Sequence, residues 1–269
     1  MPAPSSFRVL TCNVRADFES PAGDPDHWPD RAPVLQALLR REGPDVLGVQ
    51  EALWSQMETI AEALPGHRHI GFGREGGSAG EHSAIWYDAE RFEVTCWDQL
   101  ALSDAPRRIG SATWGHVCPR VVVGAVLRDR ATGEKLAVLN THLDHESEAA
   151  RVRGARMIAA LVEGDGPVAG LPVVLTGDFN CHARDAAAHR ALVADGPFDD
   201  AWDAARERLS PEWGTFPEYG EPAEGTDRID WILTRGLDVM SAEIVDPRGD
   251  DGRWHSDHMP VRAEVALRG

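Results

Sequence analysis

The chain has 269 residues and a formal net charge of −17, set by 44 acidic against 27 basic residues. With 42% hydrophobic and 26% charged residues, it has the composition of an ordinary globular protein rather than of a fibrous or disordered one. Proteins that hold long nucleic acids place Lys and Arg on the phosphates, so this acidity disfavours such a partner, although a local basic rim or bridging cations could offset it.

Short apolar runs rich in Val, Ile and Leu, bounded by Gly, Pro and Asp, predict strands along the chain. They cover residues 7–14, 46–50, 83–87, 92–100, 121–128, 136–141, 173–178, 229–233, 238–245 and 261–266. Apolar stripes at helical spacing predict helices at 31–41, 54–64, 147–163 and 184–195. Long loops are expected at 71–80, 103–119 and 211–226, where they could wall a pocket.

The order of these elements predicts the fold class. Helices interrupt the strands without the strict alternation of a doubly wound parallel sheet, so we predict an α+β sandwich in which two mixed sheets are covered by outer helices. Neither an internal repeat nor a low-complexity linker divides the sequence. Residues 1–269 are therefore expected to form a single domain.

Polar side chains stand where several of the predicted strands end. Glu51 follows the strand at 46–50 and Asn13 closes the first strand. Carboxylate and amide oxygens are ligands of the hard divalent cations that serve phosphoester hydrolysis. The plainer alternatives are a solvated acid that opens a helix, for Glu51, and a turn residue, for Asn13.

Three further groups have the chemistry of proton and phosphate handling. After the strand at 173–178, Asp178 could orient or deprotonate water and Asn180 could donate to a phosphate oxygen, although both could also belong to a plain turn. His142 and His258 lie at strand ends near acids, and Asp230 is a candidate to orient His258. A lone His is more often a surface or core group.

Six polar motifs resemble those of the endonuclease/exonuclease/phosphatase superfamily, in family order and over residues of about 7 to 266. They are Leu10-Thr11-Cys12-Asn13-Val14, Gln50-Glu51, Asn140-Thr141-His142-Leu143, Gly177-Asp178-Phe179-Asn180, Arg228-Ile229-Asp230-Trp231 and Ser256-Asp257-His258-Met259-Pro260. The resemblance implies a four-layered α/β/β/α sandwich with the site at one end of the paired sheets.

The resemblance also implies a role for each motif residue. The metal ligands would be Glu51, as the principal ligand of Mg²⁺ or Mn²⁺, with Asn13 and Asp257 nearby. Asp178 would activate the attacking water. The remaining groups would stabilise the phosphate during in-line attack: Asn180 and His142 on its oxygens, and the Asp230–His258 pair on the transition state.

A narrower resemblance is to a bacterial branch of the superfamily with undefined substrates. The stretches 140–151 and 80–87 carry it, and they imply that Glu81, His82, Asp144 and His145 shape a polar pocket. For Asp144 and His145, capping of the helix that begins near residue 146 is an equal alternative. Arg120 could hold a substrate phosphate or could be a solvated loop charge.

The sequence thus predicts a divalent-metal-dependent phosphoester hydrolase that acts on a small phosphorylated metabolite or a lipid-like phosphate. A DNA or RNA nuclease is the alternative, disfavoured by the net charge of −17. A catalytically inactive binding module is the third possibility. No protein partner is evident.

Cysteine usage and the absence of long apolar stretches bear on the compartment. Four scattered cysteines without Cys-x-x-Cys spacing argue against a disulfide framework and a thiolate zinc site. The first residues lack a signal-peptide pattern, and no stretch nears the roughly 20 apolar residues that span a bilayer. We expect a cytoplasmic protein without integral membrane contact.

Overall fold

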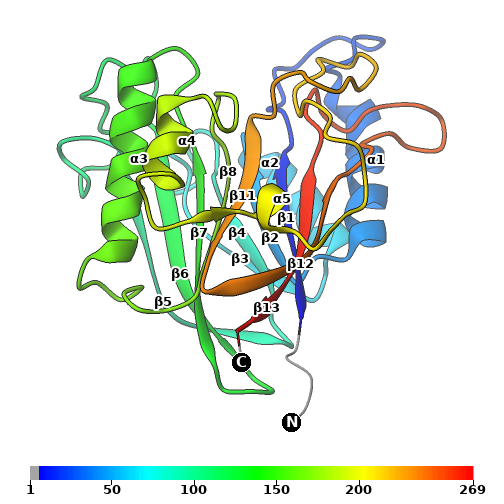
Figure 1. The fold of residues 1–269 in the computed structure, drawn as a ribbon. Coiled ribbons are helices and arrows are strands. Elements are labelled where there is room, and N and C mark those ends of the chain that lie inside the picture. Colours follow the sequence, from blue (N-terminus) through cyan, green and yellow to red (C-terminus); the bar gives the residue numbers. More distant parts are fainter. Residues whose placement is uncertain (1–5, 269) are drawn as a thin grey trace.

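Two mixed β-sheets stack face to face in the computed structural model, which describes residues 6–268 (Figure 1). The first sheet has the strand order β10-β12-β13-β1-β2-β4-β3. Its strands are β1 (Phe7–Asn13), β2 (Val46–Gln50), β3 (His67–Ile70), β4 (Ile85–Asp88), β10 (Glu207–Arg208), β12 (Leu237–Ile244) and β13 (Val261–Leu267).

The second sheet has the order β5-β6-β7-β8-β11-β9. Its strands are β5 (Phe92–Ala101), β6 (Val121–Asp129), β7 (Lys135–His142), β8 (Val173–Asp178), β9 (Asp199–Asp200) and β11 (Asp230–Arg235). The helices are α1 (Trp28–Glu42), α2 (Trp54–Ala63), α3 (Glu148–Glu163), α4 (Ala187–Leu192) and α5 (Ala201–Ala204). Figure 1 shows α1 and α2 outside the first sheet and α3 and α4 outside the second.

The central strands are buried on both faces, which explains why they read as continuous apolar runs. In β1, Val9 packs into the core between the sheets, and the next residue, Leu10, packs into the core beneath α1 and α2. In β8, Val174 and Leu175 divide in the same way between the central core and the core beneath α3. Successive side chains of a strand point to opposite faces, so a doubly covered strand needs both to be apolar.

The predicted fold class, an α+β sandwich of two mixed sheets with outer helices, is confirmed. The short strand β3 was not predicted, because its sequence His-Arg-His-Ile lacks apolar alternation and it lies at a sheet edge. Helix α1 begins three residues before the predicted start, since Pro29 occupies its first turn. The predicted helix at 184–195 is shorter, because Arg184 adopts a left-handed φ of 71°.

A polar bridge joins the two sheets close to the carboxyl ends of β2, β7 and β8. Gln50 of β2 donates to Asn140 Oδ1 of β7 at 2.7 Å, and Thr176 Oγ1 of β8 donates to the same oxygen at 2.9 Å. A side chain at Gly48 would place its Cβ 2.1 Å from Thr176 Oγ1, so this close approach of the sheets requires glycine. Gln50 and Asn140, both inside the predicted motifs, thus fix the position of one sheet on the other.

Strand register brings the remaining motif residues to one end of the sandwich. Strands β1 and β2 run parallel with Asn13 opposite Gln50, directly before Glu51. In the second sheet His142 lies opposite Asp178, which in turn lies opposite Asp230. Three neighbouring strands therefore place an imidazole and two carboxylates in one row. Within residues 6–268, no helix has both the length and the apolar character that a bilayer crossing requires.

Candidate active site

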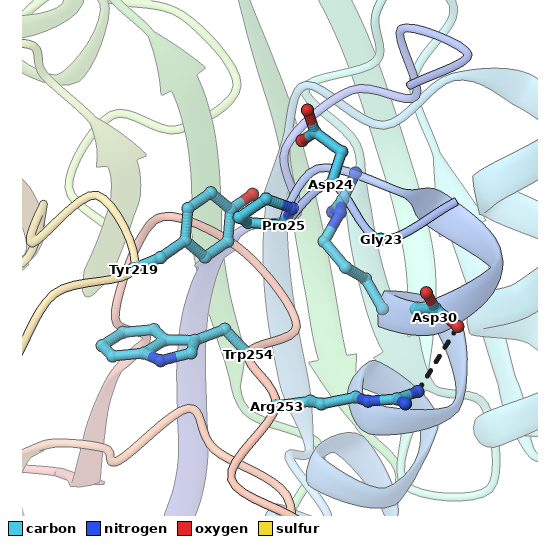
Figure 2. Close-up of a pocket in the computed structure, with 8 residues that line it drawn as sticks. Gly23, Asp24, Pro25, Asp30, Tyr219, Arg253 and Trp254 are labelled. Atoms are coloured by element: carbon cyan, nitrogen blue, oxygen red, sulfur yellow. Dashed lines mark hydrogen bonds and ion pairs between the residues drawn. The ribbon is translucent and has the colours of Figure 1, made fainter. Parts of the chain in front are cut away.

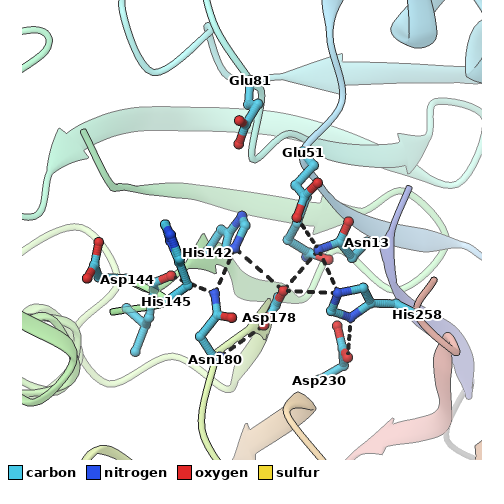
Figure 3. A network of polar contacts seen from close by, with 12 residues as sticks. Asn13, Glu51, Glu81, His142, Asp144, His145, Asp178, Asn180, Asp230 and His258 are labelled. Carbon is cyan, nitrogen blue, oxygen red and sulfur yellow. Dashed lines mark hydrogen bonds and ion pairs between the residues drawn. The ribbon is translucent and has the colours of Figure 1, made fainter. Parts of the chain in front are cut away.

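The amide of Asn13 links side chains from both sheets. Its Nδ2 donates to Glu51 Oε1 at 2.9 Å and to Asp178 Oδ2 at 2.9 Å, and it lies 3.4 Å from His258 Nε2 (Figure 3). Its oxygen accepts from the backbone N–H of Arg15 at 2.9 Å, which fixes the direction of the amide. Asn13 therefore joins the first sheet to the row of polar groups on the second.

Two residues of this group have a positive backbone φ, which residues other than glycine rarely adopt. Glu51 has a φ of 64° and Asn180 a φ of 51°. Such positions cost on the order of 1 kcal/mol or more and persist where surrounding contacts enforce them. The contacts are visible here, since Glu51 Oε2 accepts from the Ala16 N–H at 3.1 Å and Asp178 Oδ1 accepts from the Asn180 N–H at 2.9 Å. Both strained residues turn their side chains into the site.

Asp178 lies at the centre of the group. It is almost completely buried, and burial together with the neighbouring Asp230 carboxylate raises the pKa of Asp178. Its Oδ2 is 3.5 Å from His142 Nε2 and 3.7 Å from His258 Nε2. A carboxylate with a raised pKa is a stronger base than an exposed one, which suits the orientation and deprotonation of water.

His258 and Asp230 form a buried pair, with His258 Nδ1 2.9 Å from Asp230 Oδ2. Burial disfavours the imidazolium, but the carboxylates of Asp230 and Asp178 outweigh it and raise the pKa of His258 to about 10. The ring is therefore cationic at neutral pH, and its Nδ1–H donates to Asp230. A fixed positive charge beside Asp178 is suited to a phosphate oxygen.

His142, unlike His258, is neutral. Burial, with the positive charges of Arg120 and His258, holds the pKa of His142 well below its ordinary value, so the ring is neutral. Asn180 Nδ2 lies 2.9 Å from His142 Nε2 and donates to the Leu143 carbonyl at 3.0 Å. The two imidazoles thus differ in charge because the Asp230 carboxylate lies 2.9 Å from His258, whereas burial and neighbouring positive charges act on His142.

The donor set fits a divalent cation. Ligand atoms of Glu51, His142 and Asp178 lie within 4.8 Å of one another, as do those of Asp178, Asp230 and His258. The first group suits a cation better, because the imidazolium of His258 would repel it. Burial would raise the pKa of Glu51, but His258, the Asn13 amide and the Ala16 N–H outweigh it and lower that pKa, so Glu51 is ionised.

Asp257 lies apart from these two groups. Its Oδ2 is 3.5 Å from the guanidinium of Arg15, which also pairs with Asp26 at 3.1 Å. Burial raises the pKa of Asp257, although the positive charges of His258 and Arg15 oppose this rise. The structure therefore places Asp257 at the edge of the site, next to Arg15.

A flank of paired charges lies beside His142. Arg120 is buried, with one Nη 2.8 Å from His145 Nδ1 and its Nε 3.8 Å from Asp144 Oδ2. Both Arg120 Nε and Asp144 Oδ2 are buried without a hydrogen-bond partner. Asp144 also accepts from the N–H of Ser147 at 2.6 Å, whereas the α3 N-cap is Ser147 itself. Asp144 thus supports the helix start and faces Arg120 at once.

Glu81 and His82 are neighbours in sequence but differ in surroundings. Glu81 makes a two-pronged pair with Arg74 at 2.7 and 2.8 Å and lies near the site (Figure 3). The structure places His82 elsewhere: its ring is fully buried, 3.0 Å from the Ala52 carbonyl, and packs against Trp54. Of the two, only Glu81 joins the charged flank.

Two residues of the site were not singled out from the sequence. Arg74 lies in a predicted loop and pairs with Glu81, and Arg15 pairs with Asp257. Both are single charges in polar segments, so nothing in the sequence distinguishes them from solvated loop residues. Arg74 is seven residues from Glu81 in the sequence, and the turn at 75–80 brings the two together. Arg15 is 242 residues from Asp257, so that pair depends entirely on the fold.

A pocket of about 430 Å³ lies beside the first turn of α1 (Figure 2). Its lining residues are Gly23, Asp24, Pro25, Asp30, Arg31, Tyr219, Arg253 and Trp254. The Tyr219 hydroxyl donates to Asp26, so one wall of the pocket is connected to Arg15. None of the catalytic candidates lines this pocket, which is therefore adjacent to the site and separate from it.

Comparison with known proteins identifies the class. The profile of the endonuclease/exonuclease/phosphatase family matches residues 10–258. A solved family structure from Bacteroides vulgatus has a TM-score of 0.90 and 29% identity, covering 98% of this chain and 100% of that one. A mannosyl-6-phosphatase of Bacteroides thetaiotaomicron has a TM-score of 0.89 and 29% identity, covering 97% and 100%. An uncharacterised Acanthamoeba polyphaga mimivirus protein is 24% identical over 186 residues, 65% of this chain and 67% of its own.

The chain belongs to the endonuclease/exonuclease/phosphatase family, because the family profile spans most of its length. Members of this family are divalent-metal-dependent hydrolases of phosphoester bonds. The protein is therefore a phosphoesterase, as the six motifs predicted.

Proposed function

We propose that this phosphoesterase hydrolyses the phosphate ester of a small, hydroxyl-bearing metabolite, by in-line attack of an activated water. The observation that carries the proposal is the flank of alternating charges beside His142, formed by Arg74 with Glu81 and by Arg120 with Asp144. Side-by-side acids and bases bind hydroxyl groups, which donate and accept, better than they bind a polyanion. A lipid-like phosphate would contact the same phosphate-binding residues but would have no hydroxyl groups to place on the flank.

The net charge and one structural relative support a small substrate. A formal charge of −17 repels a long nucleic acid at a distance, whereas a single phosphate needs only a local cationic site. His258 and Arg120 supply such local charge. The Bacteroides thetaiotaomicron relative with 29% identity is a mannosyl-6-phosphatase, and its name points to a phosphorylated sugar.

Each residue then has a distinct part in the proposed reaction. Asp178, with its raised pKa, orients the attacking water and accepts its proton. His258 is cationic and stabilises the charge that develops on the phosphoryl oxygens, while Asp230 fixes its ring. Asn180 and neutral His142 would hold the phosphate oxygens, exchanging the contact between their own side-chain nitrogens, which are 2.9 Å apart, for contacts with the phosphate.

A bound Mg²⁺ or Mn²⁺ would polarise the phosphoryl group and neutralise part of its charge. Glu51 is proposed as the principal ligand, with the amide of Asn13 beside it and Asp178 opposite. Asp257 is proposed as an outer group that meets the site through Arg15. Glu51 would supply a carboxylate oxygen, the donor that these hard cations prefer.

A substrate comparison tests the proposal. We expect p-nitrophenyl phosphate and hexose phosphates to be hydrolysed in the presence of Mg²⁺, with slower turnover of bis-p-nitrophenyl phosphate and none of labelled DNA or RNA oligonucleotides. Asp178→Asn should lower kcat at least about a thousandfold with unchanged circular dichroism, which assigns the activity to this site. Cleavage of oligonucleotides without turnover of the small esters would contradict the proposal and favour the nuclease alternative.

A further inference from the structure

Phe216 is a large apolar side chain that remains 41% exposed beside His258. The two ring centroids are 4.6 Å apart, with the planes tilted by 42°. One part of the Phe216 ring thus covers the imidazole, and the rest faces solvent. Isolated exposed apolar residues are common and need no explanation, so its meaning depends on how firmly the chain holds it there.

The backbone that carries Phe216 is fixed to the proposed catalytic pair. The preceding residue, Thr215, is fully buried, and its hydroxyl accepts from the N–H groups of Ile229 at 2.9 Å and Asp230 at 3.0 Å. The Thr215 carbonyl accepts from the N–H of Met259, the residue after His258, at 2.8 Å. Phe216 is therefore held between the strand end that bears Asp230 and the loop that bears His258.

The other side of Phe216 is held as well. The N–H of Glu218 donates to the Asp257 carbonyl at 3.2 Å, and the Tyr219 hydroxyl donates to Asp26. Before it, a side chain at Gly214 would bring its Cβ to 2.1 Å from Thr226 Oγ1, so the turn tolerates only glycine. An aromatic ring presented to solvent by an anchored segment is preorganised for contact with a ligand.

We propose that Phe216 is a specificity-determining residue that binds the carbon skeleton of the alcohol esterified to the phosphate. The inference rests on the proposed function, because it places the phosphate at Asp178 and His258. With the phosphate there, the alcohol lies within reach of a ring that contacts His258. A flat aromatic face gains dispersion and removes apolar surface from water when it meets a ring, whether planar or the C–H face of a sugar. A short hydrated chain gains little.

The test compares Phe216→Ala with the wild type on phenyl phosphate and on glycerol 3-phosphate. We expect the KM for phenyl phosphate to rise about three- to tenfold, the range of aromatic contacts, while the KM for glycerol 3-phosphate and both kcat values change less than about twofold. Phe216→Trp should restore the low KM. Leu209→Ala is the matched control, since Leu209 is 45% exposed in the same connection but its N–H donates to the Ala242 carbonyl of β12 and not to the segments that bear Asp230 and His258.

Three results would overturn the inference. Equal losses on both esters, or a loss in kcat alone, would show that Phe216 acts by positioning His258, and no loss would show that the ring makes no contact. Ligand-observed NMR of the same two esters reports binding whether or not turnover occurs. A wild type that binds but does not hydrolyse monoesters would refute the proposed function, whereas an unchanged ratio of the two affinities in Phe216→Ala would refute this inference alone.

Discussion

Three buried ionisable groups, Asp178, Asp230 and His258, determine the charge of the site. Two carboxylates so close to each other cannot both be ionised without compensation, and the imidazolium of His258 provides it for Asp230 at 2.9 Å. Asp178, farther from the ring at 3.7 Å, keeps a raised pKa. His258, paired with Asp230, is thus a fixed cation, whereas Asp178 is a group that can accept a proton.

Asp230→Asn tests this division of roles through the pH dependence of activity. The Asp230 and Asp178 carboxylates raise the pKa of His258 to about 10, so the active cationic form should persist until the pH rises through that value. Loss of the Asp230 charge should move the alkaline limb of kcat/KM to lower pH by at least about one unit and reduce kcat/KM at pH 9. An alkaline limb that stays in place would show that His258 does not act as a cation.

At the scale of single elements, strand β11 is held by an ion pair away from the site. The guanidinium of Arg228 is 1% exposed and donates to Asp200 at 2.8 Å, and Asp200 also lies 3.0 Å from His189 Nε2. Trp231 stacks on Phe179 with centroids 4.2 Å apart. The first and last residues of the motif Arg228-Ile229-Asp230-Trp231 are therefore structural, and they fix the position of Asp230.

Substitution of this pair should show strong coupling. Arg228→Met leaves the Asp200 carboxylate buried without its main partner and should lower the free energy of unfolding by about 3–5 kcal/mol. The double substitution Arg228→Met with Asp200→Leu should cost clearly less than the sum of the two single changes. Chemical denaturation of the four proteins measures the cycle, and additive losses would mean that the pair does not act as a unit.

Apolar strands were predictable from the sequence because both of their faces are buried. The runs of β1, β2 and β8 are continuous in Val, Leu and Ile, and each was predicted within one residue of its observed bounds. Strand β3 was missed because three of its four residues, His67–Ile70, are polar, and its pairing with β4 depends on the fold alone.

The candidate site was predictable only where a motif marked it. The structure brings Asn13, Glu51, Asp178 and His258 together, although 245 positions separate the first from the last. The motif order indicated this grouping, whereas distances and charge states come from strand register and burial. The proposed role of Phe216 had no signal in the sequence, since it rests on contacts that Thr215 makes with Asp230 and Met259.

At the scale of the whole molecule, the two sheets stabilise each other through apolar contacts and through buried polar groups. His255, directly before the last motif, is fully buried with Nε2 3.3 Å from Cys12 Sγ. Burial, with the nearby charges of Arg31 and His258, lowers the pKa of His255 to about 3. The folded protein thus keeps this ring neutral where the unfolded chain would protonate it.

His255 should make the stability sensitive to mild acid. Its folded pKa of about 3 lies below the ordinary value of 6.5, so its contribution is complete above pH 6.5 and is lost as the pH falls toward 3. The free energy of unfolding should fall with a slope of up to about 1.4 kcal/mol per pH unit in this window from this group. Denaturation of His255→Asn at pH 7 and pH 5 should show a shallower slope. An equal slope in both proteins would exclude His255 as the cause.

The central claim is that Glu51 of the first sheet holds a divalent cation beside Asp178, the proposed base on the second sheet, at the site of phosphoester hydrolysis. Titration of EDTA-treated protein with Mg²⁺, monitored by p-nitrophenyl phosphate hydrolysis, tests it most directly. We predict no hydrolysis without Mg²⁺, full recovery in the wild type, and a midpoint at least about tenfold higher in Glu51→Gln. Hydrolysis that survives EDTA, or a midpoint that Glu51→Gln leaves unchanged, would contradict the claim.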